Sequence, residues 1–124
     1  MSDDHKIGPT AHYTAHAWSR LGLPHARAFA TPLGAALFWG FRLTAEVPVA
    51  WLPGLPTLEQ YLAMRHLTID AALDAARPDL LVELGAGLSR RGVTWALDRG
   101  VEVVEVDLPA MVEAKRRAPG TRAR

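Results

Sequence analysis

The sequence predicts an α/β fold in which several helices precede the first β-α-β unit of a nucleotide-binding sheet. Three features indicate this fold: an apolar run at residues 80–84 that ends in a glycine turn, a second apolar run at residues 101–106, and Asp107 directly after it. Residues 80–84 have the length and apolar density of a parallel strand that is buried on both faces. Asp107 lies 20 positions after Gly87, where an acid can accept hydrogen bonds from ribose hydroxyls. The spacing therefore predicts a site for a ligand that contains a nucleoside.

The glycine turn decides which nucleoside ligand is expected. Gly85 and Gly87 allow a positive φ and a close approach of the backbone to a ligand, and Ser89 can cap the following helix. A dinucleotide fingerprint, G-x-G-x-x-G, would need glycine where the chain has Arg90, so an NAD-dependent dehydrogenase is disfavoured. The pattern that remains is E-x-G-x-G, which begins at Glu83. It resembles motif I of the class I methyltransferases that depend on S-adenosylmethionine (SAM).

Composition limits the classes of protein to which the chain can belong. Its 124 residues can form at most one small domain, and 49% hydrophobic with 22% charged residues is typical of a globular protein. A formal net charge of +1 gives no electrostatic basis for binding nucleic acid or an anionic membrane. The chain has no cysteine, and its acidic N-terminus lacks a signal-peptide core. These features exclude disulfides and thiolate metal sites and favour a cytoplasmic protein.

A long apolar stretch at residues 33–55 has to be tested as a membrane span. Arg42, Glu46, Pro48 and Pro53 interrupt it, so it holds no run of about 18 uncharged apolar residues. A buried helix followed by an extended or turning connection at residues 47–56 is the expected structure. Contact with a membrane interface is the less favoured alternative.

Four regions follow from the pattern along the chain. Residues 1–9 are expected to be disordered, residues 10–78 to be a helical region, residues 79–117 to begin a Rossmann-like domain, and residues 118–124 to form a basic tail. The predicted helices cover residues 10–21, 26–44, 57–76, 90–99 and 109–117. Pro32 either opens or breaks the second of these helices. The residues expected in the core of that segment are Phe29, Leu33, Leu37, Phe38 and Phe41.

Two histidines in the first helix could suggest a metal site. His12 and His16 lie one helical turn apart, which is a spacing that zinc can use. No third ligand and no H-E-x-x-H pattern accompanies them. Two partly exposed helix histidines are therefore expected, and no metal site is predicted.

The helix at residues 57–76 has clear signals at both ends. Thr57 and Gln60 form a predicted capping box, and Arg77 followed by Pro78 is expected to end the helix near Ala76. The predicted apolar stripe consists of Leu58, Tyr61, Leu62, Ile69, Ala72 and Leu73.

Arg65 falls within this stripe. A guanidinium on a core-facing stripe is costly unless an anion meets it. That anion could be structural, such as Glu83, Asp70 or a carbonyl group, or it could be the carboxylate of a bound amino-acid moiety. His66 and Asp70, which lie one turn apart, are expected to form a surface pair.

Two helices are expected to flank the second strand. The crossover helix at residues 90–99 is predicted to bury Val93, Ala96 and Leu97. The helix at residues 109–117 begins with proline, which favours a first-turn position, and it is expected to turn Met111 and Val112 inward.

Three segments resemble the leucine carboxyl methyltransferase superfamily. They are EQYLAMRH at residues 59–66, LGAGLS at residues 84–89, and EVDLPAM at residues 105–111 together with Lys115. More narrowly, residues 10–117 resemble the bacterial branch of polyketide O-methyltransferases of the tetracenomycin-pathway type. The resemblance implies SAM as cofactor and a small molecule, such as a polyketide, as methyl acceptor.

The resemblance also implies roles for individual residues. Arg65 would pair with the methionine carboxylate of SAM, Gly85 and Gly87 would lie against the cofactor, and Asp107 would hold the ribose hydroxyls. The whole predicted cofactor site consists of Arg65, Glu83, Gly85, Ala86, Gly87, Asp107 and Leu108. A basic family residue in the first helix also reaches the cofactor, and the nearest match here is His12.

The chain departs from the family after residue 117. Family members continue through further strands and helices that complete the sheet and build the acceptor pocket, whereas only 45 residues run from Leu80 to Arg124. We therefore expect the N-terminal portion of a methyltransferase, and no catalytic residue is predicted. The alternative is a non-catalytic remnant, or half of a split enzyme that binds SAM weakly or only on assembly. Two strands without neighbours also predict self-association through an exposed sheet edge.

Overall fold

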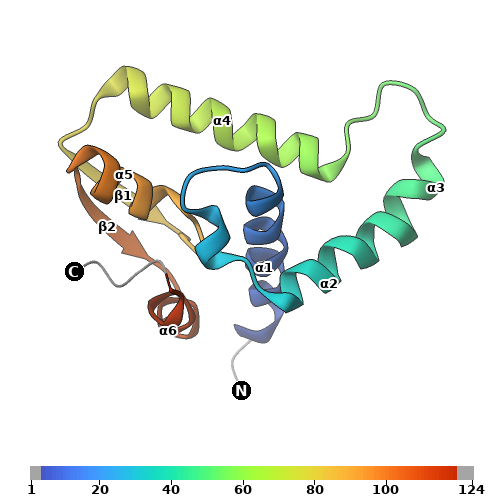
Figure 1. Cartoon of the computed structure of the whole chain (residues 1–124), viewed down its shortest axis with the longest axis horizontal. Helices are drawn as coiled ribbons and strands as arrows, with labels where there is room; N and C mark the ends of the chain where they lie inside the picture. Colours follow the sequence, from blue (N-terminus) through green and yellow to red (C-terminus); the bar gives the residue numbers. More distant parts are fainter. Residues whose placement is uncertain (1–3, 120–124) are drawn as a thin grey trace.

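A computed structural model describes residues 4–119 of the chain, with side chains from residue 8 onward, and it confirms the predicted α/β class (Figure 1). Helices α1 (Asp4–Arg20), α2 (Pro32–Phe41) and α4 (Leu58–Ala76) precede the sheet. Shorter turns connect them: η1 (Ala26–Phe29), the π-helical η2 (Arg42–Glu46) and α3 (Val47–Val49). The sheet is formed by β1 (Leu80–Leu84) and β2 (Glu102–Val106), with α5 (Arg91–Arg99) between them and α6 (Pro109–Arg117) after β2.

The two strands are parallel, as predicted. Leu80 lies opposite Glu102, and Leu84 lies opposite Val106. Helix α5 covers the face that carries Glu83, Val103 and Glu105. The apolar side chains of the other face are 43% to 76% exposed, and they are Leu80, Val82, Leu84, Val104 and Val106. The expectation that the first strand is buried on both faces is therefore wrong for the described residues, because none of their helices packs on this second face.

Helix α1 begins earlier than predicted. Residues 4–9, which were expected to be disordered, are helical, while residues 1–3 lie outside the described residues. Pro9 lies inside the helix, and its missing N–H removes one intrahelical hydrogen bond near the N-terminus. The later part of α1 is packed, and a helix that has nucleated there extends at small cost. At the other end, residues 120–124 of the expected tail lie outside the described residues.

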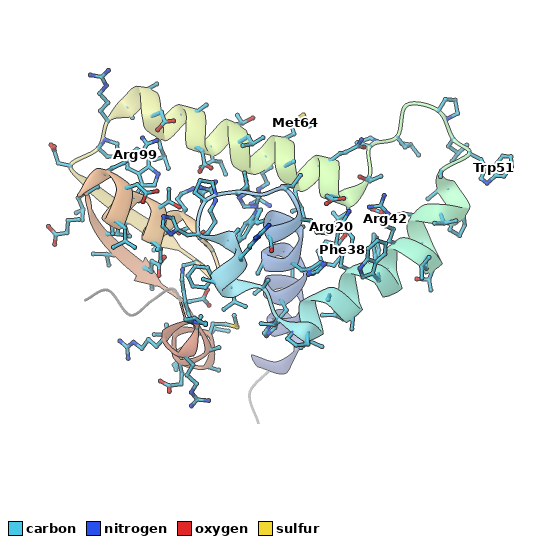
Figure 2. All side chains as sticks on the ribbon, in the orientation of Figure 1. Arg20, Phe38, Arg42, Trp51, Met64 and Arg99 are labelled. Carbon is cyan, nitrogen blue, oxygen red and sulfur yellow. The ribbon has the colours of Figure 1, made fainter. Side chains whose placement is uncertain are left out.

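Pro32 opens α2 rather than breaking a helix. Thr31 has an extended conformation and caps the helix, since its Oγ1 accepts a hydrogen bond from the N–H of Gly34 at 3.1 Å. Helical structure then continues through η2 and α3 as far as Val49. The predicted extended connection is therefore correct only after that residue. Trp51, which is 89% exposed, extends away from the tip of this segment (Figure 2).

Two groups of buried side chains form the core. The first joins α1, α2 and α4 and consists of Tyr13, Ala17, Phe38 and Leu62. The second joins α1, η1, the glycine turn and α6 and consists of Ala15, Phe29, Leu88 and Met111. Among the core residues expected from the sequence, Phe29 and Phe38 are buried, whereas Leu33 and Phe41 are exposed. The predicted inward position of Met111 is confirmed.

Helix α4 begins and ends where the sequence predicted. The N–H of Gln60 donates to Thr57 Oγ1 at 3.2 Å, and the N–H of Thr57 donates to Gln60 Oε1 at 2.9 Å, so the capping box is confirmed. The predicted apolar stripe is largely wrong, because Leu62 is the buried member and Tyr61 is 50% exposed. Met64 also points outward from α4 (Figure 2).

Helix α5 is rotated relative to the prediction. Thr94 and Trp95 are buried, whereas Ala96 and Leu97 are exposed and Val93 is half-buried. The reason is the packing of Gly92, where an added Cβ would collide with the carboxylate of Glu105 on β2. The face that carries glycine therefore approaches the strand. In the described part of the chain, no helix has the length and apolarity needed to cross a membrane.

Candidate cofactor site

The carboxyl ends of β1 and β2 bring the glycine turn and Asp107 together, as the spacing predicted. The N–H of Gly85 donates to the carbonyl of Val106 at 2.8 Å. Asp107 Oδ2 accepts the N–H of Gly87 at 2.5 Å, and its Oδ1 accepts the N–H of Leu108 at 2.6 Å. The carboxylate is therefore held at the turn by two backbone donors, and each oxygen retains a lone pair for a further donor.

The two glycines of the turn have different surroundings. Gly85 has a φ of 65°, and a Cβ added there would have no atom within 4 Å. Gly87 has a φ of 52°, and a Cβ added there would lie 3.2 Å from the Cβ of Ala11 on α1. The side of Gly85 is thus open to a ligand, while Gly87 lets α1 approach the turn. Between them, Ala86 is buried.

A pocket of about 330 Å³ adjoins the turn between α5, β2 and α6. Its walls are mainly apolar and include Val93, Leu97, Val103 and Val112. Gly87 and Asp107 also line the pocket. Lys115 Nζ donates to Glu105 Oε1 at 2.6 Å, so the pocket wall also carries a partly buried ion pair.

Arg65 lies on α4 with an exposed side chain, which corrects its expected place in a core-facing stripe. Glu83 and Asp70, the two carboxylates considered as its structural partners, both bind Arg91 instead. Arg65 is thus available to a ligand at the surface of α4. The pairing of Arg65 with the carboxylate of a bound ligand stays a prediction.

The buried guanidinium groups belong to Arg90 and Arg91, neither of which was expected to be buried. Arg91 Nε donates to Asp70 Oδ1 at 2.7 Å, and its Nη1 donates to Glu83 Oε1 at 2.8 Å. Arg90 also donates to Asp70. Both arginine side chains are only 8% exposed. We call Asp70, Glu83, Arg90, Arg91 and His66 the Arg91 cluster.

One signal in the sequence could have revealed the Arg91 cluster. Two consecutive arginines stand at the N-terminus of α5, where the helix dipole disfavours positive charge. Such a position favours arginine only when anions compensate both charges. The predicted cap from Ser89 is present in a modified form, since its Oγ accepts the N–H of Arg91 at 3.1 Å while Arg90 occupies the N-cap position.

His66 is the third partner of Arg91, and its protonation state follows from the geometry. Arg91 Nη2 lies 3.2 Å from His66 Nδ1. A guanidinium can only donate, so Nδ1 must accept, and the ring is neutral with its proton on Nε2. Burial, followed by the charges of Arg91 and Arg65, lowers the pKa of His66 to about 4. The predicted surface pair of His66 and Asp70 is therefore wrong, because both side chains turn toward Arg91.

Acid is expected to weaken the fold through His66. The histidine has a pKa of 6.5 when unperturbed and of about 4 in the folded chain, so the unfolded state binds the proton first as pH falls. Its contribution to stability is complete above pH 6.5 and is lost between pH 6.5 and 4. We expect a loss of about 2 kcal/mol after allowance for screening of the partly exposed ring. Urea unfolding at pH 7 and pH 4.5 measures this change in the free energy of unfolding.

The matched control for this prediction is His66→Asn, because asparagine keeps an oxygen that accepts from Arg91 and does not titrate. This variant should lose less stability than the natural chain between the two pH values. Equal losses in both proteins would contradict the role given to His66.

The two histidines of α1 have other neighbours. His12 Nδ1 lies 2.8 Å from Thr31 Oγ1, so this side chain contacts the cap of α2. The ring of His16 packs against Phe38 with a centroid distance of 5.2 Å. Within residues 8–119, no group of three or more histidine, aspartate or glutamate side chains could hold a metal ion.

Comparison with known proteins identifies the family. A family model described as leucine carboxyl methyltransferase matches residues 24–118, which is more than three quarters of the chain. No curated protein and no solved structure matches the chain. The matched residues include α4, both strands, the glycine turn and Asp107. The chain belongs to the leucine carboxyl methyltransferase family.

Proposed function

We propose that the chain binds SAM and belongs to an O-methyltransferase that acts on a small molecule such as a polyketide. The family supports methyl transfer in general. The observation that supports the cofactor assignment is the junction of Asp107 with the glycine turn: its carboxylate accepts the N–H of Gly87, and the space beside Gly85 is open. Ribose hydroxyls are suitable donors for such a carboxylate.

The other predicted site residues have different proposed roles. Leu108 follows Asp107 and is half-buried, so it can lie along the nucleoside. Arg65 offers an exposed guanidinium to the methionine carboxylate. Glu83 is engaged with Arg91, and its Oε2 is enclosed, so we assign it to the support of the turn rather than to contact with the cofactor.

Bound SAM supplies a methyl group on a sulfonium for in-line transfer to an oxygen nucleophile. The contribution expected of this chain is to bind and orient the donor, since transfer depends mainly on the geometry of approach. A carboxylate acceptor needs no base, whereas a hydroxyl acceptor usually does. We assign no base among the described residues.

SAM binding tests the proposal. We expect saturable binding in calorimetry, weakened at least about tenfold in Asp107→Ala and about tenfold in Arg65→Ala, because each change removes hydrogen bonds to a charged group. Asp74→Ala is the matched control, since Asp74 is exposed on α4 and pairs with Arg99. A folded chain that does not bind SAM, or an Asp107→Ala variant that binds it as tightly as the natural chain, would refute the cofactor assignment.

A second function is favoured by the exposed sheet face. We propose as the alternative that the chain binds SAM weakly, or only after assembly, without catalysis of its own. A parallel sheet normally has both faces covered, whereas Leu84 is 76% and Val82 is 51% exposed here. Binding of SAM that rises with protein concentration would favour this alternative over the first proposal.

We also propose that copies of the chain associate with one another through this sheet. Val82 lies opposite Val104 in the centre of the exposed face. Val82→Lys should shift the chain toward the monomer, because a charge there opposes both face and edge contacts. Light scattering after size exclusion at several concentrations measures it, with Met64→Lys on α4 as control. A natural chain that stays monomeric at every concentration would contradict the proposal.

A further inference from the structure

We propose that Arg91 is a positioning residue for the cofactor: it holds α4 against the end of β1 and so fixes where Arg65 lies relative to the glycine turn. The inference rests on the proposed function, in which Arg65 meets the carboxylate of SAM. Arg91 itself is buried and is not expected to touch the ligand.

The guanidinium of Arg91 bridges two elements of the fold. Its three nitrogen atoms have three different partners: Nε meets Asp70 at 2.7 Å, Nη1 meets Glu83 at 2.8 Å, and Nη2 meets His66 at 3.2 Å. His66 and Asp70 lie one turn apart on α4, whereas Glu83 lies on β1 two positions before Gly85. One planar group therefore joins the helix that carries Arg65 to the strand that leads into the glycine turn.

Few apolar contacts hold the middle of α4. Leu62, near its beginning, is the buried apolar residue of the helix, where it packs with Tyr13 and Phe38. Further along, Met64 is 61%, Leu67 is 50% and Ile69 is 36% exposed. The middle of α4 is thus held to the sheet by polar contacts, and Arg65 directly precedes one of them, His66.

This role needs arginine. A lysine ammonium is a point charge, whereas the guanidinium is a planar fork that can keep three acceptors in a fixed arrangement. The ring of Trp18 packs edge-on against His66 with a centroid distance of 4.6 Å, which places the imidazole for its contact with Arg91. Arg91→Lys should therefore retain the charge and lose the alignment.

A second arginine of α5 provides the matched control. Arg99 pairs with Asp74 farther along α4, where the two side chains are 41% and 49% exposed (Figure 2). Arg99→Lys makes the same chemical change between the same two helices, away from Arg65. An exposed pair of this kind contributes little, so we expect SAM affinity to stay within about twofold of the natural value.

The experiment is a double-mutant cycle on SAM affinity, with Arg65→Ala, Arg91→Lys and the double variant. If Arg91 acts through Arg65, each single variant should bind about tenfold more weakly, and the double variant should bind no more than about twofold more weakly than Arg65→Ala. Hydrogen exchange of residues 58–76 should be faster in Arg91→Lys. His66→Phe removes one of the three contacts and should give an intermediate loss, which keeps the test available if Arg91→Lys does not fold.

Three results would overturn the proposal. Losses that multiply in the double variant would show that Arg91 acts independently of Arg65. Natural affinity in Arg91→Lys or His66→Phe would show that the cluster does not position the site. Unchanged exchange in α4 would show that the helix is held by other contacts. If no form of the folded chain binds SAM, the proposed function fails, and the exchange data still decide separately whether Arg91 holds α4.

Discussion

Replacing Gly34 with alanine is expected to lower the free energy of unfolding by about 3 kcal/mol, at the upper end of overpacking costs. Gly34 lies where α2 crosses α1. A Cβ added there would lie 2.9 Å from the carbonyl carbon of His12, closer still to its oxygen, and 3.2 Å from the Cβ of His16. Because the obstacle is backbone of another helix, relief requires the two helices to separate. Urea unfolding followed by circular dichroism measures the loss.

Gly40→Ala is the matched control for this prediction. Gly40 lies in the same helix, and an added Cβ would meet no atom within 4 Å. Alanine there should be neutral or should stabilise by up to about 1 kcal/mol, because it favours the helix and restricts the unfolded chain. If Gly34→Ala and Gly40→Ala have the same stability, the close crossing of α1 and α2 is wrong.

Replacing Phe38 with alanine should cost about 3–5 kcal/mol, the range for the loss of a large aromatic side chain from a core. Phe38 is fully buried. Its ring packs against Tyr13 with a centroid distance of 5.3 Å, and the guanidinium of Arg20 lies 5.0 Å from its centroid (Figure 2). The substitution removes both contacts and leaves a cavity among α1, α2 and α4. Thermal and urea unfolding measure the change.

The neighbouring Trp39 is the control, because it is also aromatic and is 45% exposed. Trp39→Ala should cost about 1 kcal/mol or less, since the side chain is already partly hydrated. Phe38→Leu should lie between the two, as a volume change smaller than that to alanine. A Phe38→Ala variant as stable as Trp39→Ala would show that the first core group does not exist as described.

The same comparison shows what could be predicted about the core. The sequence indicated that Phe38 and Phe41 belong to one apolar segment, and both were expected inside. The structure buries Phe38 and leaves Phe41 41% exposed. Composition predicts that a segment has apolar side chains to bury. Their spacing does not show which of them will contact another element of the fold. Phe38 is buried because Tyr13 and Leu62, which are distant in the sequence, pack in the same cluster.

The candidate cofactor site could also be predicted only in part. The junction of Asp107 with Gly87 could be predicted because parallel strands end at one edge of their sheet and the motif spacing is local to one β-α-β unit. The place of Arg65 could not. A guanidinium on the core-facing side was expected at Arg65, whereas the structure buries that of Arg91 between carboxylates and leaves Arg65 exposed.

The sequence by itself determined the elements whose signals are local. The bounds of β1, α4 and α6 follow from an apolar run, a capping box and a proline within or beside each element. Only the tertiary structure decided which faces of these elements are buried. Asp70 and Glu83 lie 21 and 8 positions from Arg91, so their charges act on it only after the chain has brought α4 to the sheet. Burial of a charge depends on such partners, and a pattern along one helix does not contain them.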